Sequence, residues 1–229
     1  MANFKEAHKW MTCCGADGYY NADFNQAQEL VRKAEGGYSN DPRDKGGETY
    51  KGISRVFNPN WSGWVIIDAY KKTHTLKTNA YIPDKKLDEL TESYYKSEYW
   101  NKIKGDEINN QRLANMIYDM SVNPIKPGAK QIVIDSLKVV SKDDTIKNYD
   151  VKKINVADPN KLFNEIGKRR SDGYKERGGY ALNSWLNRLK SLGYGDVLET
   201  VKRNKGKTAM IALGLGIAIS GIYLYNKNK

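Results

Sequence analysis

The feature that most constrains the fold is a change in the sequence near residue 36, where helical spacing of apolar residues gives way to a stretch rich in turn-forming residues. From residue 21 onward the apolar side chains recur at helical spacing: Phe24, Ala27, Leu30, Val31 and Ala34. This spacing predicts an amphipathic helix that ends near Glu35, because Gly36-Gly37 follows where a helix C-cap would sit. Residues 38–54 are rich in turn formers, and Gly46-Gly47 is a hairpin signal. The sequence therefore predicts a helix followed at once by a small β-hairpin.

Helical periodicity returns in the second half of the chain. It is present in residues 87–100, 111–120, 129–140 and 162–192, and the last of these is interrupted at Gly178-Gly179. Residues 141–161 are dominated by Lys, Asp and Asn, and we interpret them as a surface excursion rather than as core. The predicted fold class is mainly α, as an α+β arrangement with one small hairpin after the first helix and a helical C-terminal part.

Composition excludes several classes of protein. With 39% apolar residues, 5 Trp and 16 Tyr among 229 residues, the chain can bury a sizeable core. The cysteines, Cys13 and Cys14, are adjacent, and the two histidines stand at no ligand spacing. Neither a disulfide framework nor a zinc site is expected, and no metal or organic cofactor is implied. The first ten residues lack the apolar core of a signal peptide.

The net charge of +11 favours polyanionic partners, such as nucleic acid, anionic lipid or an acidic cell wall. Just over half of this excess lies beyond Glu199, in a stretch that contains no acid. The basic residues form no helix-borne stripe and no known nucleic-acid motif, and anionic lipid explains those beside the apolar segment described next. Nucleic acid is therefore not an expected partner.

Residues 208–225 form an uncharged apolar run of 18 residues with lysines on both sides. A membrane-spanning helix needs about 17 to 25 such residues, so this run is predicted to be a C-terminal transmembrane anchor. A buried core helix is the alternative. More cations precede this run than follow it: Lys202, Arg203, Lys205 and Lys207 before it, against Lys227 and Lys229 after it. The positive-inside rule then places the body of the protein on the cytoplasmic face before any release to the cell wall.

Glu35 is the first candidate for chemistry. A carboxyl group at the C-terminal end of a helix faces the negative end of the helix dipole, which disfavours its ionised form. Desolvation would raise its pKa further. A carboxylic acid that stays protonated near neutral pH can donate a proton to the leaving oxygen of a glycoside. A surface glutamate without chemical function is the alternative at this point.

A second carboxylate, Asp44, lies nine positions further along the chain. The glycine-rich hairpin can fold it back across a cleft, and Thr49 then falls on the returning strand. Together they could hold a water on the far face of a sugar. The alternative is that Asp44 is a turn residue and Thr49 an ordinary strand residue.

The run EGGYSNDPRDKGGETYKGI, residues 35–53, resembles the signature of the glycoside hydrolase family 108 muramidases. These are lysozyme-like enzymes of phages and phage-derived secretion loci. Glu35 matches the family's catalytic glutamate, and the motif is long and specific. The resemblance implies a lysozyme-like fold and hydrolysis of bacterial peptidoglycan. Related phage-type lysozymes place a Glu, an Asp and a Thr around the scissile bond, which implies participation of Asp44 and Thr49, although Thr49 is one residue closer to the Asp than their threonine.

The resemblance continues downstream into a second region, often called a predicted peptidoglycan domain. It is carried by YYKSEYW (94–100), YDMSVNP (118–124) and SWLNRLK (184–190), whereas the Asp-Gly and Gly-Pro-Thr pattern usual in the middle of that domain is replaced here by residues 141–161. The expected organisation has an extension, a catalytic domain, a helical domain that completes the fold, a basic linker and the anchor. Their ranges are 1–21, 22–96, 97–198, 199–207 and 208–225.

Aromatic faces and amides suit carbohydrate, and five such side chains are predicted to line the sugar cleft. They are Tyr38, Asn40, Tyr99, Trp100 and Asn123. Core packing is the alternative for Tyr99 and Trp100, and Asp119 is expected to hold a structural element in place rather than to act chemically.

Three functions remain open at this stage. The leading one is a muramidase with Glu35 as general acid, acting on peptidoglycan, tethered to the membrane and released by a holin-like pore or other phage components. A lytic transglycosylase, which uses a glutamate alone, is the nearest alternative. The third is a catalytically silent, membrane-tethered virion or structural protein.

Overall fold

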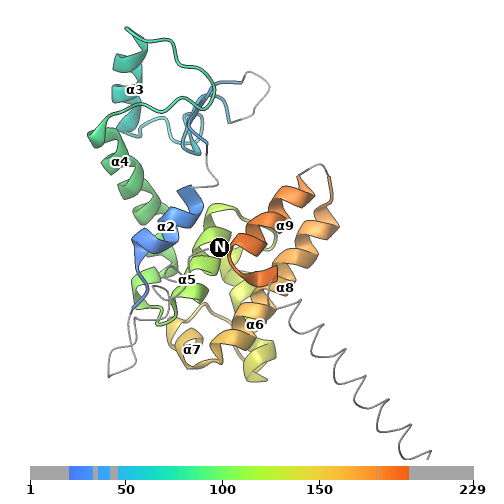
Figure 1. Cartoon of the computed structure of the whole chain (residues 1–229). Coiled ribbons are helices and arrows are strands. Elements are labelled where there is room, and N and C mark those ends of the chain that lie inside the picture. The colour runs from blue at the N-terminus through green and yellow to red at the C-terminus, as the bar shows by residue number, and fades with distance from the viewer. Residues whose placement is uncertain (1–20, 33–35, 42–45, 180, 196–229) are drawn as a thin grey trace, which may run out of the picture.

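The computed structural model describes residues 21–32, 36–41, 46–179 and 181–195 (Figure 1). This part of the chain is mainly helical, with a small three-stranded antiparallel sheet. The arrangement fits the predicted lysozyme-like α+β class. The predicted linker 199–207 and anchor 208–225 lie outside the described residues, as does the extension up to residue 20. Within the ranges that are described, no helix is both long enough and apolar enough to cross a membrane.

The helix and hairpin predicted at the start of the fold are present. Helix α2 spans Phe24–Arg32 and buries Phe24, Ala27, Gln28 and Val31. Strands β1 (Tyr38–Ser39), β2 (Thr49–Tyr50) and β3 (Ile53–Ser54) follow in the order β1-β2-β3. The third strand was not predicted. It forms because Lys51 and Gly52, the two residues of the loop between β2 and β3, both adopt positive φ, 46° and 78°. Positive φ at both positions is typical of two-residue loops that connect the strands of a β-hairpin.

Two helices complete the part of the fold around the sheet. Helix α3 (Gly63–Lys71) was not predicted, because its apolar residues form a continuous run rather than a 3.6-residue pattern. Helix α4 (Lys85–Tyr95) is capped at its N-terminus by Asp84, whose side chain accepts a hydrogen bond from the backbone N–H of Leu87. The predicted helix 87–100 is confirmed to residue 95 and then widens into the π-helical segment η1 (Lys96–Trp100). Short 3₁₀ segments η2 (Asn101–Ile103) and η3 (Gly105–Glu107) follow.

Helices α5 to α9 make up the rest of the described fold (Figure 1). Helix α5 (Gln111–Val122) packs against α2, α6 and α8, and seven of its twelve residues are buried. Helices α6 (Ala129–Ser141), α8 (Pro159–Arg177) and α9 (Leu182–Ser191) confirm the predicted helical segments. The interruption at Gly178-Gly179 is also confirmed, and both glycines have positive φ.

The interpretation of residues 141–161 as a surface excursion is wrong. The segment contains helix α7 (Val151–Val156), and it buries Ile146, Val151 and Ile154 in the core. Its aspartates have local roles, since Asp150 and Asp158 cap the N-termini of α7 and α8. Three apolar side chains therefore attach this polar segment to the core, while its charged residues remain at the surface.

One continuous hydrophobic core joins the two predicted domains, residues 22–96 and the described residues from 97 onward, which are called here the first and second parts of the fold. Helix α2 belongs to the first part by sequence but packs against α5 of the second. The proposed domain boundary at 96–97 falls where α4 runs without a break into η1. Helix α5 of the second part thus supplies the surface against which α2 packs.

Candidate active site

A cleft with a volume of about 370 Å³ opens between the end of α2, the β2–β3 turn and α4. Its walls come from four stretches of chain that are far apart in the sequence. The described residues that line it are Gln28, Val31, Arg32, Gly36, Gly37, Lys51, Asn79, Tyr81, Asp88, Thr91, Glu92 and Tyr95. The volume lies within the range of small-ligand sites.

The second of the two glycines after Glu35, Gly37, is required by close packing. A Cβ on Gly37 would lie 2.5 Å from the carbonyl oxygen of Ala80 and 2.7 Å from that of Asn79. The next residue fixes this contact, because the backbone N–H of Tyr38 donates to the carbonyl of Ala80 (2.9 Å) and Asn79 N–H donates to the carbonyl of Tyr38 (2.7 Å). The chain that leaves α2 is therefore held directly against residues 79–80.

Charged side chains in the cleft occur as opposite pairs. Arg32, at the end of α2, forms an ion pair with Glu92 on α4. Lys51 Nζ lies 2.6 Å from Asp88 Oδ1, one turn earlier on α4. Burial raises the pKa of Asp88, but hydrogen bonds from Lys51 and Tyr81 outweigh this effect, so that its pKa lies below the usual value. The charges on the described walls of the cleft are therefore balanced.

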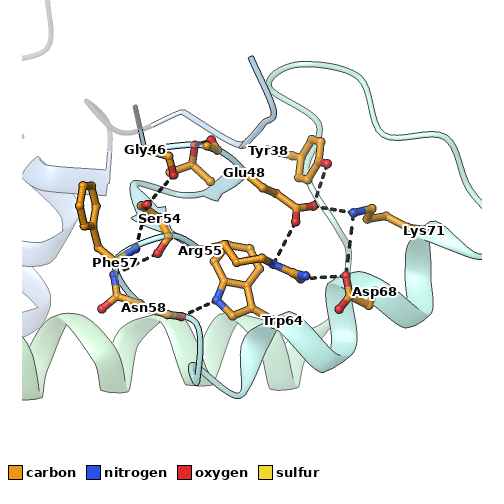
Figure 2. A network of polar contacts seen from close by, with 12 residues as sticks. Tyr38, Gly46, Glu48, Ser54, Arg55, Phe57, Asn58, Trp64, Asp68 and Lys71 are labelled. Carbon is orange, nitrogen blue, oxygen red and sulfur yellow. Dashed lines mark hydrogen bonds and ion pairs between the residues drawn. The ribbon is translucent and has the colours of Figure 1, made fainter. Parts of the chain in front are cut away.

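A second network attaches the sheet to α3, and Figure 2 shows it with Glu48 at its centre. The Glu48 carboxylate accepts hydrogen bonds from Tyr38 Oη (2.8 Å) and Lys71 Nζ (2.6 Å), and it forms an ion pair with Arg55 Nε at 2.9 Å. Arg55 also contacts Asp68 on α3 at 2.8 Å. Burial raises the pKa of Tyr38, and the bond to Glu48 raises that of Lys71. With these three partners, Glu48 fixes the hairpin rather than facing the cleft.

Comparison with known proteins identifies the first part of the chain. Residues 28–124 match the family model of glycosyl hydrolase 108. This part of the chain belongs to that family. A solved structure described as that of Brucella abortus SagA is similar over 74% of this chain and 90% of that chain, with 21% sequence identity and a TM-score of 0.45. No curated protein matches the sequence.

The glycosyl hydrolase 108 match contains the whole lining of the cleft and the segment in which Glu35 lies. Membership implies a glycosidase that degrades peptidoglycan. Within the described residues, no group of three or more His, Cys, Asp or Glu side chains is arranged to hold a metal ion.

Of the three predicted catalytic residues, the structure describes only Thr49. Glu35 and Asp44 lie outside the described residues. Thr49 lies in β2, where it stands opposite Ser39 of β1 and Ser54 of β3. Its hydroxyl donates to the carbonyl of Gly47 at 3.3 Å, and it is partly buried. Thr49 is not among the residues that line the cleft.

The side chains predicted to bind sugar are spread over both parts of the fold, and none of the five lines this cleft. Tyr38 is 5% exposed, and its hydroxyl is bonded to Glu48. Asn40 is exposed beside β1. Tyr99 is partly buried between the rings of Tyr94 and Tyr95. Asn123 accepts hydrogen bonds from the Arg188 guanidinium when its amide is oriented to suit them.

Trp100 requires a correction, because its side chain has no exposed surface. Its indole N–H donates to Asp106 at 2.8 Å, and the rings of Phe24 and Tyr118 pack edge-on against it. A side chain enclosed in this way cannot contact a glycan. Trp100 instead joins α2 to α5 in the core, which was the alternative interpretation of this aromatic residue.

Sequence reasoning missed most of the residues that line the cleft. Asp88 and Glu92 could have been found, since two carboxylates four residues apart lie on one face of a helix. Tyr81 carries no such signal, because it lies in the long connection between α3 and α4. Its place in the cleft follows from tertiary contacts alone.

Proposed function

We propose that the chain is a muramidase, which hydrolyses the β-1,4 bond between N-acetylmuramic acid and N-acetylglucosamine with Glu35 as general acid. The observation that carries the proposal is the position of the cleft. Arg32 and Gly36, on the two sides of the segment that ends with Glu35, both line it. Gly36, Gly37 and Lys51, which belong to the same motif as Glu35, line a cleft of a size suited to a sugar, and this supports the proposal.

The reaction needs two groups on opposite faces of the scissile bond. Glu35 donates its proton to the bridging oxygen as the bond from that oxygen to the anomeric carbon breaks. Asp44 accepts a proton from water, whose hydroxyl forms the new bond to the anomeric carbon. The Thr49 hydroxyl positions this water. Asn40 and Tyr99, which keep exposed surface, are retained as proposed sugar contacts, whereas Tyr38 and Asn123 already bond to other side chains.

The product end group tests this proposal. Purified sacculi are digested with the purified full chain, and the fragments are reduced with borohydride and analysed by mass spectrometry. We expect fragments that end in reducible N-acetylmuramic acid. Fragments lighter by one water, with a non-reducible anhydro end, would show a lytic transglycosylase. Reducible N-acetylglucosamine ends would contradict the proposed bond, and no fragments from a folded chain would indicate the silent structural alternative.

Residues 208–225 are proposed to anchor the body to the membrane, with the body on the cytoplasmic face. The uncharged length and the excess of cations before it support this topology. Peptidoglycan lies on the other side of the membrane, so the enzyme would be stored until a holin-like pore or a translocation step releases it.

Fractionation of bacterial cells that express the full chain tests this topology. We expect the chain in the membrane fraction, with its body protected from protease added to intact spheroplasts. The matched control is a chain with Leu213→Lys and Ile217→Lys, two charges that oppose insertion. Recovery of the unaltered chain in the soluble fraction would contradict the anchor. Digestion of the body in intact spheroplasts would contradict only the orientation.

A further inference from the structure

Tyr81 differs from the other aromatic side chain that lines the cleft. Tyr95 is 3% exposed and its hydroxyl donates to the carbonyl of Lys51 at 2.7 Å. Tyr81 lines the same cleft but keeps 54% of its surface exposed. A large aromatic ring left open in a cleft is available to a ligand.

The ring of Tyr81 is held in one orientation by its neighbours. Its hydroxyl donates to Asp88 on α4. The Lys51 ammonium, itself 2.6 Å from Asp88, lies over the ring at 4.7 Å from its centroid. These contacts fix the hydroxyl end and occupy one face of the ring. The ammonium covers only one face, and Tyr81 keeps more than half of its surface exposed beside the cleft.

The backbone on both sides of Tyr81 is also fixed. The carbonyl of Ala80 accepts the bond from Tyr38 of the sheet, and the N–H of Ile82 donates to Tyr50 Oη at 3.3 Å. Ile82 is buried in the core. The ring is therefore positioned before any ligand arrives, which reduces the entropy lost on binding.

Lys51 occupies a conformation that usually suits glycine or asparagine. Its φ of 46° places it in the left-handed region, which is strained for a residue with a Cβ. Its side chain is 17% exposed and is directed to Asp88 and Tyr81. Backbone strain of this kind is often found beside functional sites.

We propose that the open face of Tyr81 is a stacking platform for one neutral N-acetylhexosamine ring of the glycan strand. This inference rests on the proposed function and adds a binding site to it. The C–H groups on one face of a pyranose match the electron-rich face of an aromatic ring. Among the described residues that line the cleft the charges are paired and leave no net charge to select an anion, while the Asn79 amide and the Arg32–Glu92 pair can bond to sugar hydroxyls.

The ligand used to test the platform is a soluble oligomer of β-1,4-linked N-acetylglucosamine. Its dissociation constant is measured by calorimetry with the full chain, and KM and kcat are measured on sacculi. Tyr81→Ala and the space-filling Tyr81→Leu should raise Kd and KM about five- to tenfold, the usual range for an aromatic contact, with kcat changed less than about twofold. Tyr81→Phe keeps the ring and should stay within about threefold.

Phe57→Ala is the matched control, because Phe57 is an aromatic side chain 72% exposed in the same part of the fold but does not line the cleft. Its Kd should equal that of the unaltered chain. Unchanged Kd in folded Tyr81→Leu, while the unaltered chain binds and cleaves, would overturn the platform and leave the proposed function standing. An unaltered chain that neither binds the oligomer nor cleaves sacculi would overturn both.

Discussion

Glu35→Gln is expected to abolish cleavage of peptidoglycan while the protein stays folded. The amide keeps the shape of the side chain but has no proton to give to the leaving oxygen, and loss of general acid catalysis lowers rates by about 10²- to 10⁴-fold. The measurement is the release of soluble fragments from purified sacculi, with a thermal melt of each protein to confirm folding.

Glu89→Gln provides the matched control for this variant. Glu89 lies on α4, is exposed, and is not among the residues that line the cleft. It should cleave sacculi at the unaltered rate. Cleavage at the unaltered rate by folded Glu35→Gln would refute the assignment of Glu35 as the general acid.

The same assay ranks the other proposed catalytic residues. Asp44→Asn and Thr49→Ala are each expected to lower the rate by about 10²-fold if they activate and position water. Asp144→Asn and Thr73→Ala, both at exposed positions, should have no effect. A loss smaller than about threefold for both test variants would mean that they shape the hairpin and do not take part in the chemistry.

Asp119→Asn is expected to cause the largest loss of stability among single charge changes in the described chain. Asp119 is 2% exposed, and Arg170 beside it is fully buried. Arg170 Nη2 lies 2.8 Å from Asp119 Oδ2, and Arg188 Nε lies 2.6 Å from Oδ1. The side chain thus joins α5 to α8 and α9. Removing its charge leaves a buried guanidinium without its counter-ion, which costs about 3 to 5 kcal/mol in free energy of unfolding.

For a chain of this length, such a loss corresponds to a Tm lower by about 6 to 20 °C, which a calorimetric or circular dichroism melt can measure. Asp172→Asn is the control, because the Asp172 side chain is 57% exposed in its pair with Lys175. It should change the free energy of unfolding by less than about 1 kcal/mol. Equal Tm values for the two variants would show that the buried cluster contributes no more than a surface pair.

The confirmed predictions were those that depend on residues close together in the sequence. Helix α2 and the hairpin could be predicted because the helical spacing of apolar residues and the glycines that end it lie within about thirty residues of one another. The motif that begins at Glu35 is continuous, so the family could be identified without a structure. The predicted chemistry of Glu35 and Asp44 likewise comes from sequence and remains a prediction.

Tertiary structure decided which side chains meet. Tyr81, Asp88 and Lys51 are up to 37 positions apart, and they form one cluster only because α4 packs beside the β2–β3 turn. The burial of Trp100 depends on α2 and α5, which come from distant parts of the chain. Periodicity reports which face of an element is apolar, but the partner of that face is chosen by packing over the whole chain. The helix and the hairpin were therefore determined by sequence, whereas the lining of the cleft was determined by the fold.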